Sequence, residues 1–138
     1  MVEINNITEK YRSIDNDFLM KTAEKVLKSE TSEKDAELSI GLVDSENIKA
    51  LNSKYRKKDC STDVLSFGKI GEEISEIIIC PEEVKKNAEA SGEAFEKELA
   101  RVLIHGVLHI LGYDHEEKES EAKKMFAKQE EYLSKIKF

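Results

Sequence analysis

The residues best placed to do chemistry are the histidines, because all 3 of them fall in the segment HGVLHILGYDH, residues 105–115. His105 and His109 are four residues apart, so in a helix both imidazoles leave the same face, one turn apart. Gly112 would end that helix, and His115 follows three residues later. Three ring nitrogens can then meet at one point, so the spacing predicts a metal site formed by His105, His109 and His115.

The ligand set also indicates which metal binds and what it does. Three imidazoles leave the fourth tetrahedral position open, which is typical of catalytic zinc sites and not of structural ones. Nitrogen ligands favour zinc, one ion per chain, over other divalent metals. A bound zinc ion lowers the pKa of its water from 15.7 to about 7, which supplies hydroxide at neutral pH. Asp114 is a competing ligand, and the alternative without metal is a set of core histidines bonded to backbone or carboxylate groups.

Gly106 separates this segment from a protease motif of the same spacing. The metzincin pattern H-E-x-x-H-x-x-G-x-x-H matches everywhere except at the glutamate that acts as general base, where this chain has Gly106. A peptidase would need a carboxylate from elsewhere, such as Glu98, Glu116 or Glu117. Glycine inside a helix costs about 1 kcal/mol relative to alanine, so we expect a strand or the substrate to approach the backbone there.

A second chemical group lies earlier in the chain, where four basic residues fall within residues 54–58. The guanidinium of Arg56 has a fixed fork of donors that suits a phosphate group. A cation beside a metal stabilises the charge that grows on a phosphoryl transition state. The two groups together favour phosphodiester hydrolysis over peptide hydrolysis. The formal net charge of −7 weighs against a general nucleic-acid binder, but binding follows the local field of a cleft.

The composition bounds the class of protein. A chain of 138 residues with 39% hydrophobic and 37% charged residues predicts one soluble globular domain, a metal-dependent hydrolase domain over residues 1–138. We expect a cytoplasmic protein with no membrane association, because the N-terminus lacks a signal-peptide pattern and the longest apolar run is too short to span a bilayer. Cys60 and Cys80 are expected to be free thiols.

Hydrophobic periodicity predicts the elements that must position these residues. The fold class is α/β (α+β), with a four-stranded, mostly mixed sheet, about five helices and the metal-binding helix at its centre. The expected strands are Val2–Ile7, Glu37–Val43, Asp63–Phe67 and the apolar Glu76–Cys80, which is buried on both faces. The expected helices are 15–30, one capped by Asp44, Pro81–Ala90, Glu93–Leu111 and Glu116–Ile136.

Side-chain patterns assign the faces of these helices. Glu98, Arg101, His105 and His109 form the polar stripe of the metal-binding helix, which is otherwise apolar nearly all round. The pattern puts Ile48, Leu51 and Tyr55 on the buried side of the helix capped by Asp44. The last helix carries Ala122, Phe126, Tyr132 and Leu133 among many charges, which indicates a surface helix.

Three blocks of the chain carry a resemblance to a known family: LVDSENIKALNSKYRKKDCSTDVLSF (Leu42–Phe67), EIIICPEEV (Glu76–Val84) and ELARVLIHGVLHILGYDH (Glu98–His115). In these blocks the chain resembles the YbeY-type endoribonucleases, zinc-dependent proteins of bacterial ribosomal RNA maturation. It implies that His105, His109 and His115 bind the metal and that Arg56 matches the family's essential arginine. Lys58 matches a nearby lysine, and Glu76 stands where the family has an acidic residue, so both are expected to bind substrate with Arg56. Ser61 and Gly68 replace two family prolines, and Ser75-Glu76 replaces a Gly-Asp pair.

The expected function is that of a metal-dependent, single-strand endoribonuclease in rRNA maturation and ribosome quality control, in which metal-bound water attacks an RNA phosphodiester. The resemblance implies small-subunit rRNA as substrate, and a small-subunit ribosomal protein and a ribosome-assembly GTPase as partners. Two alternatives stay open from the residues alone. One is a minimal zinc metalloprotease-like hydrolase, and the other is a non-enzymatic ribosome-assembly module with structural zinc.

Overall fold

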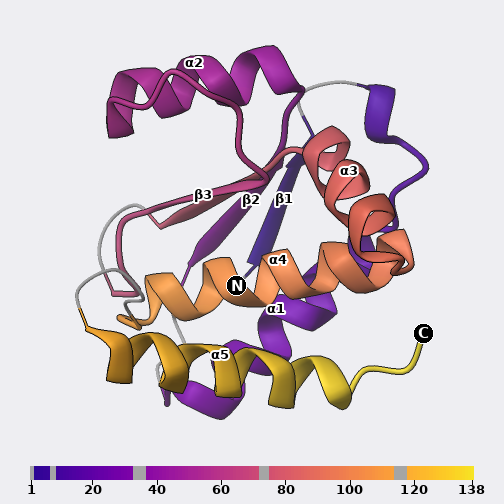
Figure 1. Cartoon of the computed structure of the whole chain (residues 1–138). Helices are drawn as coiled ribbons and strands as arrows, with labels where there is room; N and C mark the ends of the chain where they lie inside the picture. Colours follow the sequence, from indigo (N-terminus) through magenta and orange to yellow (C-terminus); the bar gives the residue numbers. More distant parts are fainter. Residues whose placement is uncertain (1, 7–8, 33–36, 72–74, 114–117) are drawn as a thin grey trace.

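The computed structural model describes residues 2–6, 9–32, 37–71, 75–113 and 118–138 (Figure 1). Its strands are β1 (Val2–Asn6), β2 (Leu38–Leu42), β3 (Val64–Phe67) and β4 (Glu76–Ile79). Its α-helices are α1 (Asn16–Glu30), α2 (Ser45–Arg56), α3 (Pro81–Ser91), α4 (Phe95–Ile110) and α5 (Glu119–Ser134), and a short 3-10 helix η1 covers Glu9–Tyr11. The predicted α/β fold with a mixed sheet is confirmed, and α4 is the predicted metal-binding helix.

The four strands form one sheet in the order β1-β2-β4-β3. β1, β2 and β4 are parallel to one another, while β3 runs antiparallel to β4 and forms one edge. β4 is interior, and its three isoleucines are buried on alternating faces, which explains its uniformly apolar sequence. Because β3 is an edge strand, only one of its sides pairs with the rest of the sheet.

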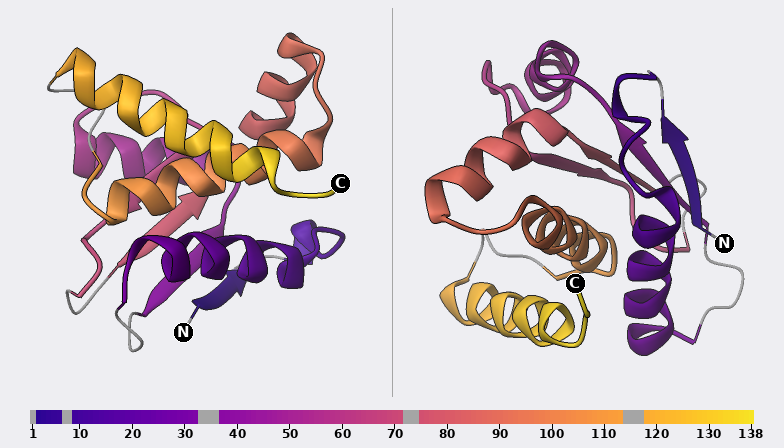
Figure 2. Two further views of the ribbon diagram at one scale, coloured as in Figure 1. Left: turned by 90° about the horizontal axis from the view of Figure 1, so that it is seen from below. Right: turned by 90° about the vertical axis from the view of Figure 1, so that its right-hand side faces the viewer.

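Helices cover both faces of the sheet. α2 packs on one face, where Ile48 joins Leu65 and Ile78 in a small cluster. α1 and α4 pack on the other face, and Figure 2 shows α5 against α4 on the side away from the sheet. α4 therefore lies between the sheet and α5, as expected for a helix that is apolar nearly all round.

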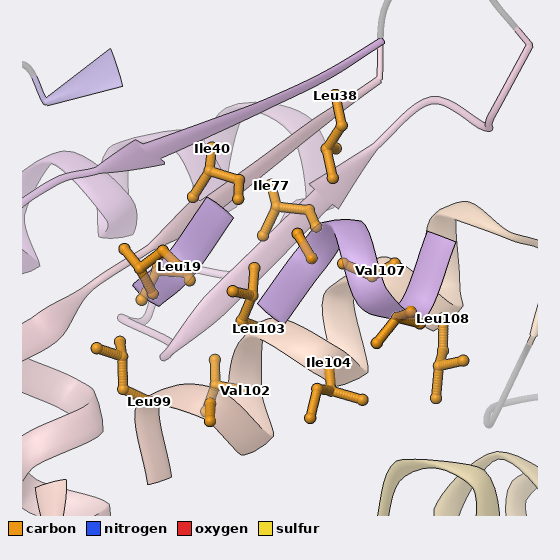
Figure 3. Packing of buried hydrophobic residues seen from close by; sticks show 14 of the residues in the cluster. Leu19, Leu38, Ile40, Ile77, Leu99, Val102, Leu103, Ile104, Val107 and Leu108 are labelled. Carbon is orange, nitrogen blue, oxygen red and sulfur yellow. The ribbon is translucent and has the colours of Figure 1, made fainter. Parts of the chain in front are cut away.

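The core between α4 and the sheet is continuous. Leu103 and Val107 of α4 lie beneath Ile40 and Ile77 of the central strands (Figure 3). All four side chains are fully buried. Burial of a side chain of this size contributes about 1.5–3 kcal/mol, so this layer fixes the position of α4 relative to the sheet.

Local signals in the sequence define most helix ends. The Asp15 and Asp44 carboxylates accept hydrogen bonds from the backbone of α1 and α2, so both are N-caps, and the predicted cap at Asp44 is confirmed. Pro81 begins α3, and Gly92 ends it in the left-handed region with φ 70°. α4 begins at Phe95, not at Glu93. None of the helices in the described ranges is both long enough and apolar enough to span a membrane.

Two aromatic side chains lie on the surface, and for Tyr55 this is contrary to the sequence prediction. Tyr55 is 56% exposed, because the last turn of α2 lies over edge strand β3, where its ring meets Phe67. The polar side chain of Asn52 is buried instead, 4% exposed. Phe126 is 62% exposed, and the neighbouring Met125 takes the inward position on α5.

Candidate functional site

A cleft of about 720 Å³ opens where α2, β3, α4 and α5 meet at the edge of the sheet. The polar stripe of α4 forms one wall, and all four of its predicted members line the cleft. Arg56, Lys58 and the loop that follows α2 form the opposite wall. The cleft therefore brings together the two groups that the sequence singled out, the histidines and the basic cluster.

His105 and His109 lie side by side on the α4 wall, with ring centroids 5.0 Å apart and ring planes at 79°. Both are partly buried. His105 Nδ1 is 2.8 Å from Gln129 Oε1 of α5. Because an amide oxygen only accepts hydrogen bonds, Nδ1 carries the proton and the lone pair is on Nε2. An acceptor bonded to the ring nitrogen that does not bind the metal is what orients a metal-binding imidazole.

The third predicted ligand, His115, lies outside the described residues, as do Asp114, Glu116 and Glu117. Within the described ranges, no three His, Cys, Asp or Glu side chains form a group that could hold a metal ion. The metal site accordingly stays a prediction. The donor set nevertheless fits one, because two imidazoles share a wall and His105 has its tautomer fixed for binding through Nε2.

Behind Gln129, one guanidinium gathers three carboxylates. Arg101 donates to Glu93 at 2.5 Å, to Glu98 at 2.6 Å and to Glu130 at 3.2 Å. The hydrogen bond from Arg101 lowers the pKa of Glu93, and the bond to Glu93 is the main cause that raises the pKa of Arg101. Gln129 Nε2 donates to Glu130 at 3.2 Å, which orients its oxygen toward His105. Glu98, one of the carboxylates that could serve a peptidase, is bound within this network.

Tyr113 adds a second buried network at the end of α4. Its hydroxyl donates to Glu30 Oε1 at 2.6 Å, and Tyr132 donates to the other oxygen of the same carboxylate. Burial alone would raise the pKa of Glu30, but the two hydroxyl donors lower it below its usual value. The hydrogen bond and burial raise the pKa of Tyr113 to about 12. These bonds join α1 to α4 and α5 beside the cleft.

Arg56 is the last residue of α2, and its side chain reaches edge strand β3. Arg56 Nη2 donates to the carbonyl of Ser66 at 2.8 Å, and Ser66 Oγ donates to the carbonyl of Gly106 at 3.3 Å. Ser66 therefore connects Arg56 to the turn of α4 that lies between the two histidines. Lys57, the C-cap that follows α2, has φ 57°, the only positive φ of a non-glycine residue in the described chain. This conformation turns the chain sharply after Arg56.

Asn52 holds the loop that carries Lys58. Its buried Nδ2 donates to the carbonyl of Cys60 at 2.9 Å, and its own carbonyl accepts from the backbone N–H of Lys58 at 3.3 Å. Lys58 is exposed and lines the cleft. Cys60 and Cys80 are both free thiols, as predicted, with Cys60 exposed and Cys80 buried.

Gly106 is where the sheet approaches α4, which confirms the prediction of a close contact. A Cβ at this position would lie 3.0 Å from Ile77 Cγ2 and 3.2 Å from Ser66 Oγ. A side chain here would point into strands β4 and β3, while His105 and His109 point into the cleft. The site therefore leaves no room for the glutamate of the metzincin motif.

Glu76 begins β4, where it is partly buried and lies opposite Phe67 of β3. It does not appear among the described residues that line the cleft. Its expected role in substrate binding stays a prediction. Gln129 and Asn52, in contrast, line the cleft although sequence reasoning missed both. No sequence signal marked them, because the burial of the Gln129 amide, 7% exposed, is seen only in the structure.

Comparison with known proteins agrees with the resemblance of the three sequence blocks. The family model described as endoribonuclease YbeY matches residues 3–137. An "Endoribonuclease YbeY" of Petrotoga mobilis is 41% identical over 138 residues, which cover 98% of this chain and 96% of that protein. Its counterpart of Thermotoga neapolitana is 47% identical over 95 residues, 69% of this chain and 64% of that protein.

The fold comparison gives the same result. A Thermotoga maritima protein whose structure was solved in solution is similar with a TM-score of 0.69 and 36% identity, over 96% of this chain and 87% of that one. The chain belongs to the endoribonuclease YbeY family.

Proposed function

We propose that this chain is a metal-dependent endoribonuclease that cuts single-stranded RNA in the cleft between α2 and α4. The observation that carries the proposal is that Arg56 and the two histidines line one cleft and are connected through Ser66. A cation suited to phosphate and two imidazoles at ligand spacing are the parts needed for hydrolysis of a phosphodiester. The names of the relatives support RNA as the substrate class.

Each residue has a distinct role in the proposal. His105, His109 and His115 hold one divalent metal ion, zinc by the chemistry of the donor set. The ion, when bound, supplies hydroxide near neutral pH. Gln129 holds His105 in the tautomer that has its lone pair on Nε2. Arg56 binds an oxygen of the scissile phosphate and stabilises the charge that develops there.

Lys58 adds positive charge to the wall on which Arg56 lies. On the other wall, Glu98 and Arg101 line the cleft. Glu93 and Glu130 accept hydrogen bonds from the same guanidinium, so carboxylates outnumber cations in this network. We assign the phosphate backbone to the α2 wall, because phosphates bind to Lys and Arg and are repelled by carboxylates. Glu76 completes the proposed set of substrate-binding residues from the strand beside β3.

The cellular role is part of the same proposal. It comprises maturation and quality control of small-subunit rRNA in the cytoplasm by one domain over residues 1–138. A small-subunit ribosomal protein and a ribosome-assembly GTPase are the proposed partners. The family resemblance supports these assignments.

The metalloprotease alternative is disfavoured by the packing at Gly106. The general base of such a protease stands beside the first histidine, and here that position faces Ile77 at 3.0 Å. A non-enzymatic module with structural zinc would need a fourth protein ligand.

The proposal is tested by incubating the zinc-loaded protein with single-stranded RNA. We expect cleavage that stops on chelation of zinc and returns when zinc is restored. His109→Ala should abolish both zinc binding and cleavage. Arg56→Ala should keep the zinc and lower the cleavage rate by about 100-fold, as expected for loss of one transition-state donor. Lys124→Ala, an exposed cation on α5, is the matched control and should cleave as the wild type does.

Equal cleavage by zinc-loaded and zinc-free protein would contradict the metal-dependent mechanism. Peptide hydrolysis that needs His109 but is indifferent to Arg56→Ala would favour the protease. An ion held by four protein ligands, seen by X-ray absorption spectroscopy, would favour the structural-zinc module.

A further inference from the structure

Two aromatic rings and two cations, one of them Arg56, gather on the surface at the end of α2. Tyr55 and Phe67 meet edge to face, with ring centroids 5.4 Å apart and planes at 70°. The Lys54 ammonium lies 5.2 Å from the centre of the Tyr55 ring, and the Arg56 guanidinium lies 6.0 Å from that of Phe67. We call these four residues, Lys54, Tyr55, Arg56 and Phe67, the rim platform.

The exposure of Tyr55 follows from the place where α2 ends, over edge strand β3, and it leaves an aromatic side chain in water next to Arg56. Ile48 packs α2 on the sheet and the buried Asn52 holds the loop after α2, while more than half of Tyr55 is in water. Among the described residues, the other exposed large hydrophobic side chains are Phe126 and Phe138. Phe138 packs against Phe18, and neither Phe126 nor Phe138 lines the cleft or is next in sequence to a residue that lines it.

The rim platform is continuous with the cleft through β3. Ser66 contacts Gly106 of α4 with its hydroxyl and Arg56 with its carbonyl. Phe67 is the next residue and faces α2, since side chains alternate along a strand. An RNA strand that leaves the α4 wall of the cleft and passes Arg56 therefore reaches Tyr55 and Phe67 next.

We propose that the rim platform binds an unpaired nucleobase of the RNA, next to the phosphate held by Arg56. This inference rests on the proposed function and names how that site recognises a single strand. The π face of an exposed tyrosine accepts any base by stacking, and the flanking cations neutralise the adjoining phosphates. A base paired within a duplex cannot present its face to a side chain, so the contact selects unpaired RNA.

The test measures binding separately from cleavage. The zinc-loaded protein is titrated on ice into a fluorescent single-stranded oligoadenylate, and the dissociation constant is read from anisotropy. A gel run afterwards checks that the oligonucleotide is intact. Tyr55→Ala should weaken binding about 5- to 10-fold, the low end for loss of one base stack. Tyr55→Phe, which keeps the ring, should bind within about 2-fold of the wild type. Phe126→Ala removes an equally exposed ring from α5 and should change nothing.

Two further readouts separate stacking from loss of structure. An oligonucleotide of the same length with abasic sites should bind wild type and Tyr55→Ala equally, because it offers phosphates without bases. In cleavage assays on unmodified RNA, Tyr55→Ala should raise KM with little change in kcat, the pattern of lost ground-state binding. Melting temperatures of all variants should stay at the wild-type value, since Tyr55 is outside the core.

The outcomes distinguish this inference from the function on which it rests. If the wild type cleaves RNA but Tyr55→Ala and the wild type bind oligoadenylate equally tightly, the base-binding role of the rim platform is wrong and the proposed nuclease activity stands. If binding depends on Tyr55 but no RNA is cleaved, the platform stands and the proposed activity is wrong. An equal loss of affinity for the abasic and the complete oligonucleotide would also overturn the stacking contact.

Discussion

Replacing Gln129 with Met removes the oxygen that orients the imidazole of His105. Gln129 Oε1 is 2.8 Å from His105 Nδ1. Because Gln129 is only 7% exposed, bulk water does not readily replace the lost acceptor. Met has nearly the same volume and is flexible, so the packing of α5 on α4 should survive. The substitution therefore tests the role of the oxygen and not that of the helix.

The magnitude follows from what the hydrogen bond does. Loss of an outer-shell partner of a metal-bound histidine typically costs about 10- to 100-fold in metal affinity, or about 1.4–2.7 kcal/mol. Without metal, the variant loses one hydrogen bond at a partly buried nitrogen, which costs about 1 kcal/mol. Gln129→Glu keeps an acceptor and makes it anionic, which raises the basicity of the ligand, so zinc should bind at least as tightly as in the wild type.

The assay is a competition for zinc between the protein and a chromophoric chelator, with thermal unfolding measured at the same free zinc concentrations. Stabilisation by zinc depends on the ratio of free zinc to its dissociation constant, so the Met variant should gain less stability from zinc by the same 1.4–2.7 kcal/mol, approximately. Lys124→Met makes the corresponding change at an exposed position of α5 and serves as control.

Wild-type zinc affinity in Gln129→Met would refute the role assigned to Gln129. Equal loss in Gln129→Met and Gln129→Glu would point to disturbed packing in place of a missing acceptor. If the wild type itself binds no zinc, the metal-site prediction for the three histidines is wrong.

Three further predictions concern the frame of the site. Gly106→Ala should destabilise the protein by about 1 kcal/mol, because overpacking against Ile77 at 3.0 Å outweighs the gain in helix propensity. In urea titrations, the double variant with Ile77→Ala should lose less unfolding free energy than the two single variants lose together. Burial and the hydrogen bond to Glu30 raise the pKa of Tyr132 to about 12, so its contribution is complete below pH 10 or so and is lost as the pH rises through about 12. In Tyr132→Phe, the unfolding free energy should fall less steeply with pH over this alkaline range, by the slope that one proton contributes. An unchanged slope would contradict the raised pKa of Tyr132. Asn52→Leu should cost about 1–3 kcal/mol in a denaturant titration, because the Cys60 carbonyl loses its donor, and a neutral result would mean that water replaces the amide.

The sequence predicted those features that local chemistry determines. Asp44 at the start of α2 and Pro81 at the start of α3 act within one turn of their own positions, so their signals are readable without the fold. The apolar run of β4 requires burial on both faces, which only an interior strand provides. Glycine at position 106 predicted a close approach, but the strand involved could be identified only from the structure.

Other features depend on distant residues and could not be predicted in the same way. Gln129 meets His105 across 24 positions of sequence, and nothing in the pattern of α5 marks it as an acceptor. Tyr55 falls at a helical repeat of Ile48 and Leu51, yet it is exposed because α2 ends over the edge of the sheet and not over its middle. Periodicity shows which residues share a face, whereas the extent of the neighbouring surface decides which of them are covered.

The edge position of β3 explains why Arg56 and the histidines lie around one cleft. β3 is antiparallel to β4 and lies at the edge of the sheet, so one of its sides has no neighbouring strand. Ser66 can therefore give its hydroxyl to Gly106 on one face and its carbonyl to Arg56 of the helix on the other. An interior strand has neighbours on both sides that compete for its backbone groups and block the passage between its faces. A cleft between α2 and α4 is accordingly best formed at an edge, and the short strand between the two helices sets the separation of Arg56 from the histidines.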